Sequence, residues 1–310
     1  MSSSKKSLLE LQSLSVEEIQ SIFSLASQLK KDFFHPENRM SSLASIVKTS
    51  PVALMFFEPS TRTRMSFETA CARLQVPTLL LDGASGTSLE KGESILDTLE
   101  NVAAMLPQAL VIRVGKEFDL ESFQHRCSIP IINAGWGVQG HPTQALLDLF
   151  TLLENGISLQ TLKILYVGDV RHSRVVASHF QLLKKWNVQM GACAPRSFLP
   201  DSFPGQVFDQ LEEGLSWCNV VMSLRGQTER HPQGLSISPE EYHHQYGLNA
   251  MSVRALSAQA WIMHPGPVMM GVDMTVDVAK DPRSLILQQV QNGTFLRQAV
   301  LIHLLSKGKQ

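Results

Sequence analysis

The sequence has few of the features that mark membrane-spanning, secreted or metal-binding proteins. Only four of its 310 residues are cysteines, Cys71, Cys127, Cys193 and Cys218. Their wide separation argues against a dense disulfide framework and offers no zinc-ligand spacing. No apolar run approaches the roughly 20 residues of a membrane span, and the first residues lack the apolar region and cleavage site of a signal peptide. We therefore expect a cytoplasmic protein with buried or reduced thiols.

The chain also lacks a strong excess of charge of either sign. Its formal net charge is −1, so it has no general attraction for nucleic acid or an anionic membrane. Any anion-binding site must therefore be built locally. The hydrophobic content of 44% and the charged content of 18% are those of an ordinary globular protein. The length is sufficient for two domains, and no internal repeat or low-complexity tract is present.

Apolar strands and amphipathic helices alternate along the chain. Strands are predicted at residues 52–57, 78–81, 109–114, 129–132, 162–167, 188–194, 220–223 and 261–263, with helical patterns between most of them. This alternation predicts an α/β fold with two domains, each a mainly parallel sheet with helices on both faces. A capping box at residues 15–18 starts the first helix. A helix over residues 285–305, with a weak point at Asn292 and Gly293, closes the chain.

The segment FEPSTRTR, residues 57–64, stands between the first strand and a helix. Pro59 ends the strand, and Ser60 is a residue type whose side-chain oxygen caps free backbone N–H groups. Hydroxyl and guanidinium donors then gather at the positive end of the helix, in Ser60, Thr61, Arg62 and Thr63. A capped surface helix with solvated arginines is the alternative. Four donor residues in a row favour a phosphate site.

Further polar residues follow later strands. Arg113, Arg174, Arg225 and the turn at His264 fall at predicted carboxyl ends, where open parallel sheets bind ligands. A single arginine at such a place is often a salt-bridge partner instead, and we expect Glu58 and Arg230 to be interdomain partners of this kind.

Five motifs together resemble the aspartate branch of the carbamoyltransferase family over nearly the whole chain. They are FEPSTRTR at 57–64, TSLEKGE at 87–93, HPTQ at 141–144, RGQ at 225–227 and HPGP at 264–267. Motifs typical of the ornithine branch, such as His-Pro-Cys-Gln, are not present. The resemblance implies the carbamoyltransferase fold and a cytoplasmic homotrimer with shared active sites. It implies that the protein transfers a carbamoyl group from carbamoyl phosphate to L-aspartate. The products would be N-carbamoyl-L-aspartate and phosphate, in de novo pyrimidine (UMP) biosynthesis.

The resemblance also implies roles for individual residues. It assigns catalysis to Arg62, Thr63, Arg113, His141 and Gln144. It assigns carbamoyl phosphate binding to these five and to Ser60, Thr61, Pro265 and Gly266, with Ser88 and Lys91 supplied by an adjacent subunit. It assigns aspartate binding to Lys91, Arg174, Arg225 and Gln227. Thr87 is an alternative to Ser88. No cofactor and no metal is expected.

The implied domains are residues 1–142 with 291–310 for carbamoyl phosphate and residues 155–290 for aspartate, joined by a helix at 143–154. Trp136 stands where many family members have aspartate, and Met269 and Met270 replace an Asn-Arg pair. These departures leave two alternatives: a weakly catalytic structural or regulatory chain, and a carbamoyltransferase for another amine. A larger complex with a regulatory or dihydroorotase-type chain is compatible with the resemblance.

Overall fold

The computed structural model describes residues 7–36, 50–83, 85, 87–226 and 237–306 of the chain. The chain divides into two compact units, and we call Met1–Phe150 with Val290–Gln310 unit 1 and Thr151–Gln289 unit 2. The first boundary falls inside helix α5 (Pro142–Glu154) and the second inside α10 (Ile286–Ser306). Unit 2 is therefore an insertion in the chain of unit 1, and the last helix returns to the unit that the N-terminus begins.

Unit 1 is built on four parallel strands in the order β2-β1-β3-β4. They are β1 (Val52–Phe56), β2 (Thr78–Asp82), β3 (Ala109–Val114) and β4 (Ile131–Trp136). All five residues of β1 are buried, as expected for a strand with neighbours on both sides. The strand order reverses between β1 and β3. Such a reversal leaves a crevice at the carboxyl ends of the strands, where open parallel sheets bind ligands.

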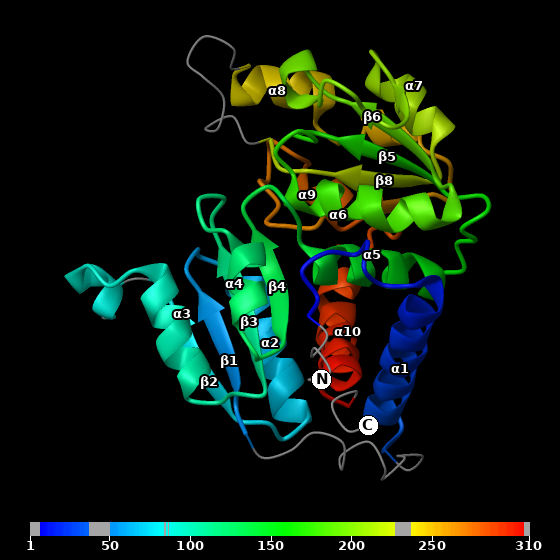
Figure 1. The fold of residues 1–310 in the computed structure, drawn as a ribbon. Helices are drawn as coiled ribbons and strands as arrows, with labels where there is room; N and C mark the ends of the chain where they lie inside the picture. Colours follow the sequence, from blue (N-terminus) through cyan, green and yellow to red (C-terminus); the bar gives the residue numbers. More distant parts are fainter. Residues whose placement is uncertain (1–6, 37–49, 84, 86, 227–236, 307–310) are drawn as a thin grey trace. The chain divides into compact units, whose positions relative to one another are not determined.

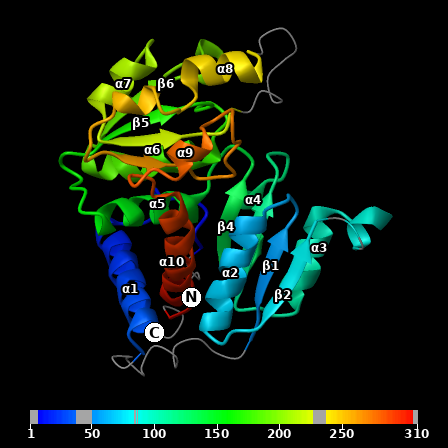
Figure 2. The same ribbon diagram turned by 180° about the vertical axis from the view of Figure 1, so that it is seen from behind.

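Helices cover both faces of this sheet. Figure 1 shows α3 (Ile95–Ala104) and α4 (Leu120–Arg126) on one face, and Figure 2 shows α2 (Thr61–Arg73) on the other. Helix α1 (Val16–Phe34) begins with the predicted capping box at Ser15 and Glu18. Helix α10 binds to α2 through two hydrogen bonds, from Arg73 to Thr294 at 2.8 Å and from Arg297 to Ser66 at 2.9 Å.

The predicted weak point in the last helix was wrong, because α10 is continuous through Asn292 and Gly293. Asn292 is fully buried and accepts a hydrogen bond of 2.7 Å from Lys30. A Cβ atom on Gly293 would lie 2.6 Å from the Arg297 guanidinium and 3.2 Å from Leu147. The glycine is therefore present because neighbouring side chains approach the helix closely, and tertiary packing stabilises the helix despite its low helix propensity.

Unit 2 contains five parallel strands in the order β7-β6-β5-β8-β9. They are β5 (Lys163–Val167), β6 (Gln189–Cys193), β7 (Gln206–Val207), β8 (Val220–Ser223) and β9 (Trp261–Met263). The helices are α6 (Arg174–Leu183), α7 (Leu211–Trp217), α8 (Pro239–Tyr246) and α9 (Val276–Ala279). The order reverses between β5 and β8, so unit 2 has its own topological switch point, the position at which open parallel sheets bind ligands.

The two parallel sheets with their helices confirm the predicted α/β class. Most predicted strands lie within a residue or two of the observed ones, although β4 begins later and extends to Trp136. The sequence did not predict β7, because two exposed residues give no apolar run. All four cysteines are free thiols, and only Cys127 is not fully buried. Among the described helices, none has the length and apolar character needed to cross a bilayer.

Candidate active site

The first turn of α2 forms the predicted corner between β1 and the helix. Ser60 occupies the N-cap position, but the expectation that its side chain caps the helix was wrong, since it makes no capping hydrogen bond. Its backbone angles, φ −162° and ψ 85°, differ from those of Ser15, which does cap its helix at φ −74° and ψ 164°. The α2 N-terminus also has no acidic residue in its first turn, so its positive end is not neutralised by a neighbouring carboxylate there.

The two arginines of this turn have different surroundings. Arg64 donates a hydrogen bond of 2.6 Å to Asp82 at the end of β2. Arg62 is half-buried, and burial lowers the pKa of its guanidinium while the carboxylate of Asp148 opposes that shift. Arg64 is thus engaged in a surface ion pair. Arg62 has its charge held partly away from water, where it attracts an anion more strongly.

Arg113 lies beside this corner, across the β1–β3 switch point. It pairs in register with Phe56, and its carbonyl accepts a hydrogen bond of 2.9 Å from Phe57. Its guanidinium Nε lies 3.6 Å from a carboxylate oxygen of Glu58. Glu58 was expected to be an interdomain partner together with Arg230. Arg230 lies outside the described residues, and Glu58 contacts Arg113 within unit 1.

His141 and Gln144 reach the same region from the start of α5. The hydroxyl of Thr63 lies 3.4 Å from Nε2 of His141, which is 4% exposed. Gln144 is 8% exposed and donates from Nε2 to Asp148 at 2.9 Å. The structure therefore brings the donors after β1, β3 and β4 together within unit 1. The corner combines hydroxyl, guanidinium, imidazole and amide groups, a set suited to a phosphate and a polarised carbonyl.

Trp136 replaces the aspartate seen in many family members without disordering the segment before His141. Its indole Nε1 donates to the carbonyl of Phe118 at 2.9 Å, and its backbone N–H donates to Gly140 at 3.0 Å. The ring is 7% exposed. Buried Asn133 supports the same loop by donating to the carbonyls of Leu9 and Gly140.

In unit 2, the loops after β5 and β8 meet at the second switch point. Arg174 begins α6 after a Ser173 cap, and Arg225 follows β8. Gly168, the first residue after β5, has φ +120°, and a Cβ atom there would lie 2.7 Å from the carbonyl oxygen of Leu224. Only glycine fits this close approach. Both predicted arginines therefore follow the strands that flank the second switch point.

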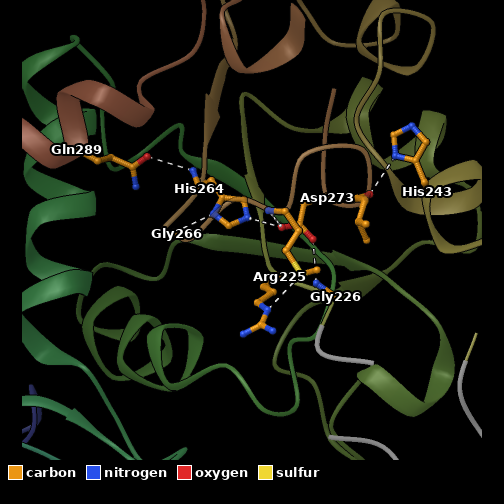
Figure 3. A network of polar contacts seen from close by, with 9 residues as sticks. Arg225, Gly226, His243, His264, Gly266, Asp273 and Gln289 are labelled. Carbon is orange, nitrogen blue, oxygen red and sulfur yellow. Dashed lines mark hydrogen bonds and ion pairs between the residues drawn. The ribbon is translucent and has the colours of Figure 1, made fainter. Parts of the chain in front are cut away.

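A buried carboxylate connects the loop of Arg225 to the His264 turn, as Figure 3 shows. Asp273 is 1% exposed and accepts hydrogen bonds from Gly226 N–H at 3.0 Å and Met269 N–H at 2.8 Å. It also accepts from Nε2 of His264 at 3.2 Å. Because Gly266 N–H donates to Nδ1 of His264 at 2.8 Å, the imidazole proton must lie on Nε2. These bonds fix the turn that contains Pro265 and Gly266.

Met269 is one of the three residues that depart from the expected family pattern, and it contacts a predicted site residue directly. The Arg225 Nε lies 3.3 Å from the Met269 sulfur. Burial raises the pKa of Tyr242 well above its usual value, and the carboxylates of Asp273 and Asp169 add to this shift. Tyr242 therefore stays a neutral phenol, and its side chain lies against Gly168 after β5 and Gly226 after β8.

The remaining predicted site residues are exposed or undescribed. Ser88 and Lys91 are both exposed on the 3₁₀ turn η3 (Ser88–Lys91), which Figure 1 shows projecting outward beyond β2 and α3. Pro265 and Gly266 are half-buried. Gln227 lies outside the described residues. Within the described part of the chain, no three His, Cys, Asp or Glu side chains gather in a way that could hold a metal ion.

Sequence reasoning missed Asp148 and Asp273. Asp148 stands alone among apolar residues in the segment ALLDLF, and this isolation was a visible signal. Asp273 gave no comparable signal, because its partners are backbone N–H groups brought together only by the fold.

Two domain models of one family match the chain. The aspartate/ornithine carbamoyltransferase carbamoyl-P binding domain matches residues 6–154, and the Asp/Orn binding domain of the same family matches residues 160–304. The chain belongs to the aspartate/ornithine carbamoyltransferase family. The predicted resemblance is thereby confirmed.

Relatives and solved structures agree with this membership. The aspartate carbamoyltransferase catalytic subunit of Helicobacter pylori is 39% identical over 96% of this chain and 97% of its own. That of Christiangramia forsetii is 38% identical over 98% and 97%. Aspartate transcarbamoylase from Trypanosoma cruzi in complex with carbamoyl phosphate and aspartate matches with a TM-score of 0.85 and 25% identity, covering 96% of both chains. The same enzyme with N-(phosphonacetyl)-L-aspartic acid also matches at 0.85 and 25%, covering 96% and 95%.

Proposed function

We propose that this member of the carbamoyltransferase family is an aspartate carbamoyltransferase. It transfers the carbamoyl group of carbamoyl phosphate to L-aspartate, giving N-carbamoyl-L-aspartate and phosphate in de novo pyrimidine biosynthesis. The relatives at 38–39% identity are named as catalytic subunits of this enzyme. The observation that carries the proposal is that donor groups flank the switch point of each sheet, next to β1 and β3 in unit 1 and next to β5 and β8 in unit 2.

The switch point of unit 1 suits carbamoyl phosphate. Ser60, Thr61 and the α2 N-terminus bind the phosphate with neutral donors, and Arg62 adds a guanidinium whose fork matches two phosphate oxygens. Thr63, Arg113 and His141 donate to the carbamoyl oxygen, where negative charge develops as the amine attacks. One well-placed donor of this kind contributes about 3–4 kcal/mol to catalysis. We assign residues 1–142 and 291–310 to this substrate.

The carbamoyl NH₂ group requires acceptors. Gln144 offers an amide oxygen, and the turn at Pro265 and Gly266 offers two backbone carbonyls, which neighbouring prolines and the Asp273 network hold in place. As the resemblance implies, we assign these acceptors to recognition of the carbamoyl NH₂ group.

The switch point of unit 2 suits the dicarboxylate. Arg174 and Arg225 pair with carboxylates through their planar forks, and Gln227 and Lys91 complete the set. Two arginines favour aspartate over a diamine. We assign residues 155–290 to aspartate, with α5 as the connecting helix.

The reaction then needs no side chain as a general base. The aspartate nitrogen forms a bond to the carbamoyl carbon, the bond from that carbon to the phosphate ester oxygen breaks, and the amine proton passes to the departing phosphate. The residues of the site supply position and electrostatic stabilisation.

A homotrimer with shared sites fits the surface of unit 1. Edge strand β2 exposes Leu79 at 37% and Leu80 at 45%, and Met105 and Leu106 are exposed at 64% and 71%. An exposed apolar edge strand favours association with another chain. Ser88 and Lys91 follow β2 on η3, so contact at this edge would place them beside a neighbouring subunit. Light scattering of the purified chain tests this proposal: a mass of three chains supports it, and a monomer contradicts it.

The substrate assignment is tested by incubating the purified chain with carbamoyl phosphate and either aspartate or ornithine. The ureido product of each amino acid is then measured separately. We expect a ureido product only when the amino acid is aspartate. The assignment would be overturned if a product formed only from ornithine. It would also be overturned if neither amino acid gave a product although the chain binds carbamoyl phosphate. We place the enzyme in the cytoplasm.

A further inference from the structure

We propose that Asp148 is a positioning residue that fixes the amide of Gln144 in one orientation and so makes the site selective for carbamoyl phosphate over other acyl phosphates. This inference rests on the proposed function, because it concerns how the NH₂ group of that substrate is recognised. Asp148 does not touch the substrate in this account. It acts through Gln144.

The geometry of the pair determines which side of the Gln144 amide faces the site. The two residues lie four positions apart on α5, and Nε2 of Gln144 is 2.9 Å from Oδ1 of Asp148. An ionised carboxylate only accepts hydrogen bonds, so the NH₂ side of the amide must face Asp148. The amide oxygen is then directed to the opposite side. An acceptor in that position matches the NH₂ group of carbamoyl phosphate.

Two arginines, Arg297 and Arg62, interact electrostatically with the Asp148 carboxylate. Asp148 is 1% exposed and Arg297 is 3% exposed. Burial lowers the pKa of Arg297 to about 10, and the Asp148 carboxylate opposes this shift, as it does at Arg62. A buried carboxylate persists only where such cations compensate its loss of hydration. Arg297 is itself anchored by its 2.9 Å hydrogen bond to Ser66 and lies 5.2 Å from the Phe67 ring centre.

Neutralising Asp148 reverses the orientation of Gln144. In Asp148→Asn, the two guanidiniums attract the oxygen of the new amide, which leaves its NH₂ group facing Gln144. Gln144 then accepts that hydrogen bond with its oxygen and presents its own NH₂ group to the ligand. A donor would face the donor of carbamoyl phosphate. Acetyl phosphate has a methyl group in the same place and gains nothing from the native acceptor.

The test compares these two ligands. Dissociation constants for carbamoyl phosphate and acetyl phosphate are measured calorimetrically for the wild type, Asp148→Asn and Asp148→Glu. Because loss of one buried hydrogen bond with a mismatched partner weakens binding by about 10- to 100-fold, we expect Asp148→Asn to reduce the preference for carbamoyl phosphate by this factor. Asp148→Glu keeps an acceptor-only side chain and should retain most of the preference.

A matched control separates positioning from loss of packing. Helices α2 and α10 are joined by the Arg297–Ser66 hydrogen bond and by a second one from Arg73 to Thr294. Thr294→Val removes the second hydrogen bond and leaves Asp148 unchanged. It should leave the preference between the two ligands unchanged. Thermal melts verify folding, and if Asp148→Asn does not fold, Asp148→Ser is measured in its place with the same expected loss.

The outcomes distinguish this inference from the proposed function. If the wild type does not bind carbamoyl phosphate, the proposed function fails. If the wild type binds it and the variant weakens both ligands equally, Asp148 has only a structural role and the inference is overturned. A selective loss for carbamoyl phosphate, with acetyl phosphate little changed, supports it.

Discussion

Removal of the Arg62 guanidinium should abolish most activity while leaving the fold intact. In Arg62→Ala the phosphate loses a charge-assisted hydrogen bond of about 1.5–3 kcal/mol, which corresponds to a rise in the KM for carbamoyl phosphate of about 10- to 100-fold. The loss of a preorganised donor from the transition state should lower kcat by about 10²- to 10³-fold. Because burial already disfavours this charge, as the lowered pKa of Arg62 indicates, its removal should cost little stability.

The matched control is Arg64→Ala, two positions along the same helical turn. Arg64 is engaged with Asp82 at 2.6 Å in a partly exposed ion pair, an interaction that contributes at most about 1 kcal/mol to stability. Ureido product is measured under steady-state conditions for both variants, with circular dichroism melts for folding. Arg64→Ala should retain kcat within a few-fold of wild type. A folded Arg62→Ala enzyme with near-normal rates, or equal losses in the two variants, would refute the phosphate role.

Three further predictions follow from the packing. Asp273→Asn places an NH₂ group against backbone or imidazole N–H donors. This variant should lower the free energy of unfolding, measured by urea titration, by about 1–3 kcal/mol and should raise the KM for aspartate. Unchanged stability would contradict the hydrogen-bond network around Asp273. Gly293→Ala should destabilise by about 1–3 kcal/mol, although alanine is the better helix former, because its methyl group would meet Arg297; a stabilised variant would contradict this packing. In the native enzyme a thiol reagent should modify Cys127 alone, and rapid labelling of all four thiols would disprove the burial of the other three. Burial raises the pKa of Cys71, Cys193 and Cys218 to about 12. The free energy of unfolding should therefore fall as pH rises from 9 towards 12, because in that range these thiols ionise only in the unfolded chain.

The fold could be predicted because its signals are local. Each buried strand of a parallel sheet gives a short apolar run, and the helices begin at recognisable caps such as Ser15 and Ser238. The two-residue strand β7 has no such run and was missed. The weak point predicted at Gly293 was wrong because a glycine in a sequence does not reveal whether it breaks a helix or allows a close contact.

The candidate site could be predicted only in part, for a related reason. Residues that lie next to strand ends, such as Arg62, Arg113 and Arg174, can be placed by the topology rule alone. The residues that hold these arginines and their loops in place can be identified only from contacts between positions far apart in the sequence. Asp148 interacts with Arg297, and Asp273 joins the Gly226 and Met269 backbones, so neither role is visible before the chain is folded. Ser60 does not cap α2 as expected, because the turn sets its backbone angles and the residue type alone does not determine them.

The central claim is that the corner at Ser60 to Thr63 binds the phosphate while the unit 2 arginines bind the amino acid. A crystal structure of this chain with N-(phosphonacetyl)-L-aspartic acid tests it most directly. We expect phosphonate density within hydrogen-bonding distance of Ser60, Thr61 and Arg62, and carboxylate density at Arg174 and Arg225. Phosphonate density away from the α2 N-terminus would contradict it.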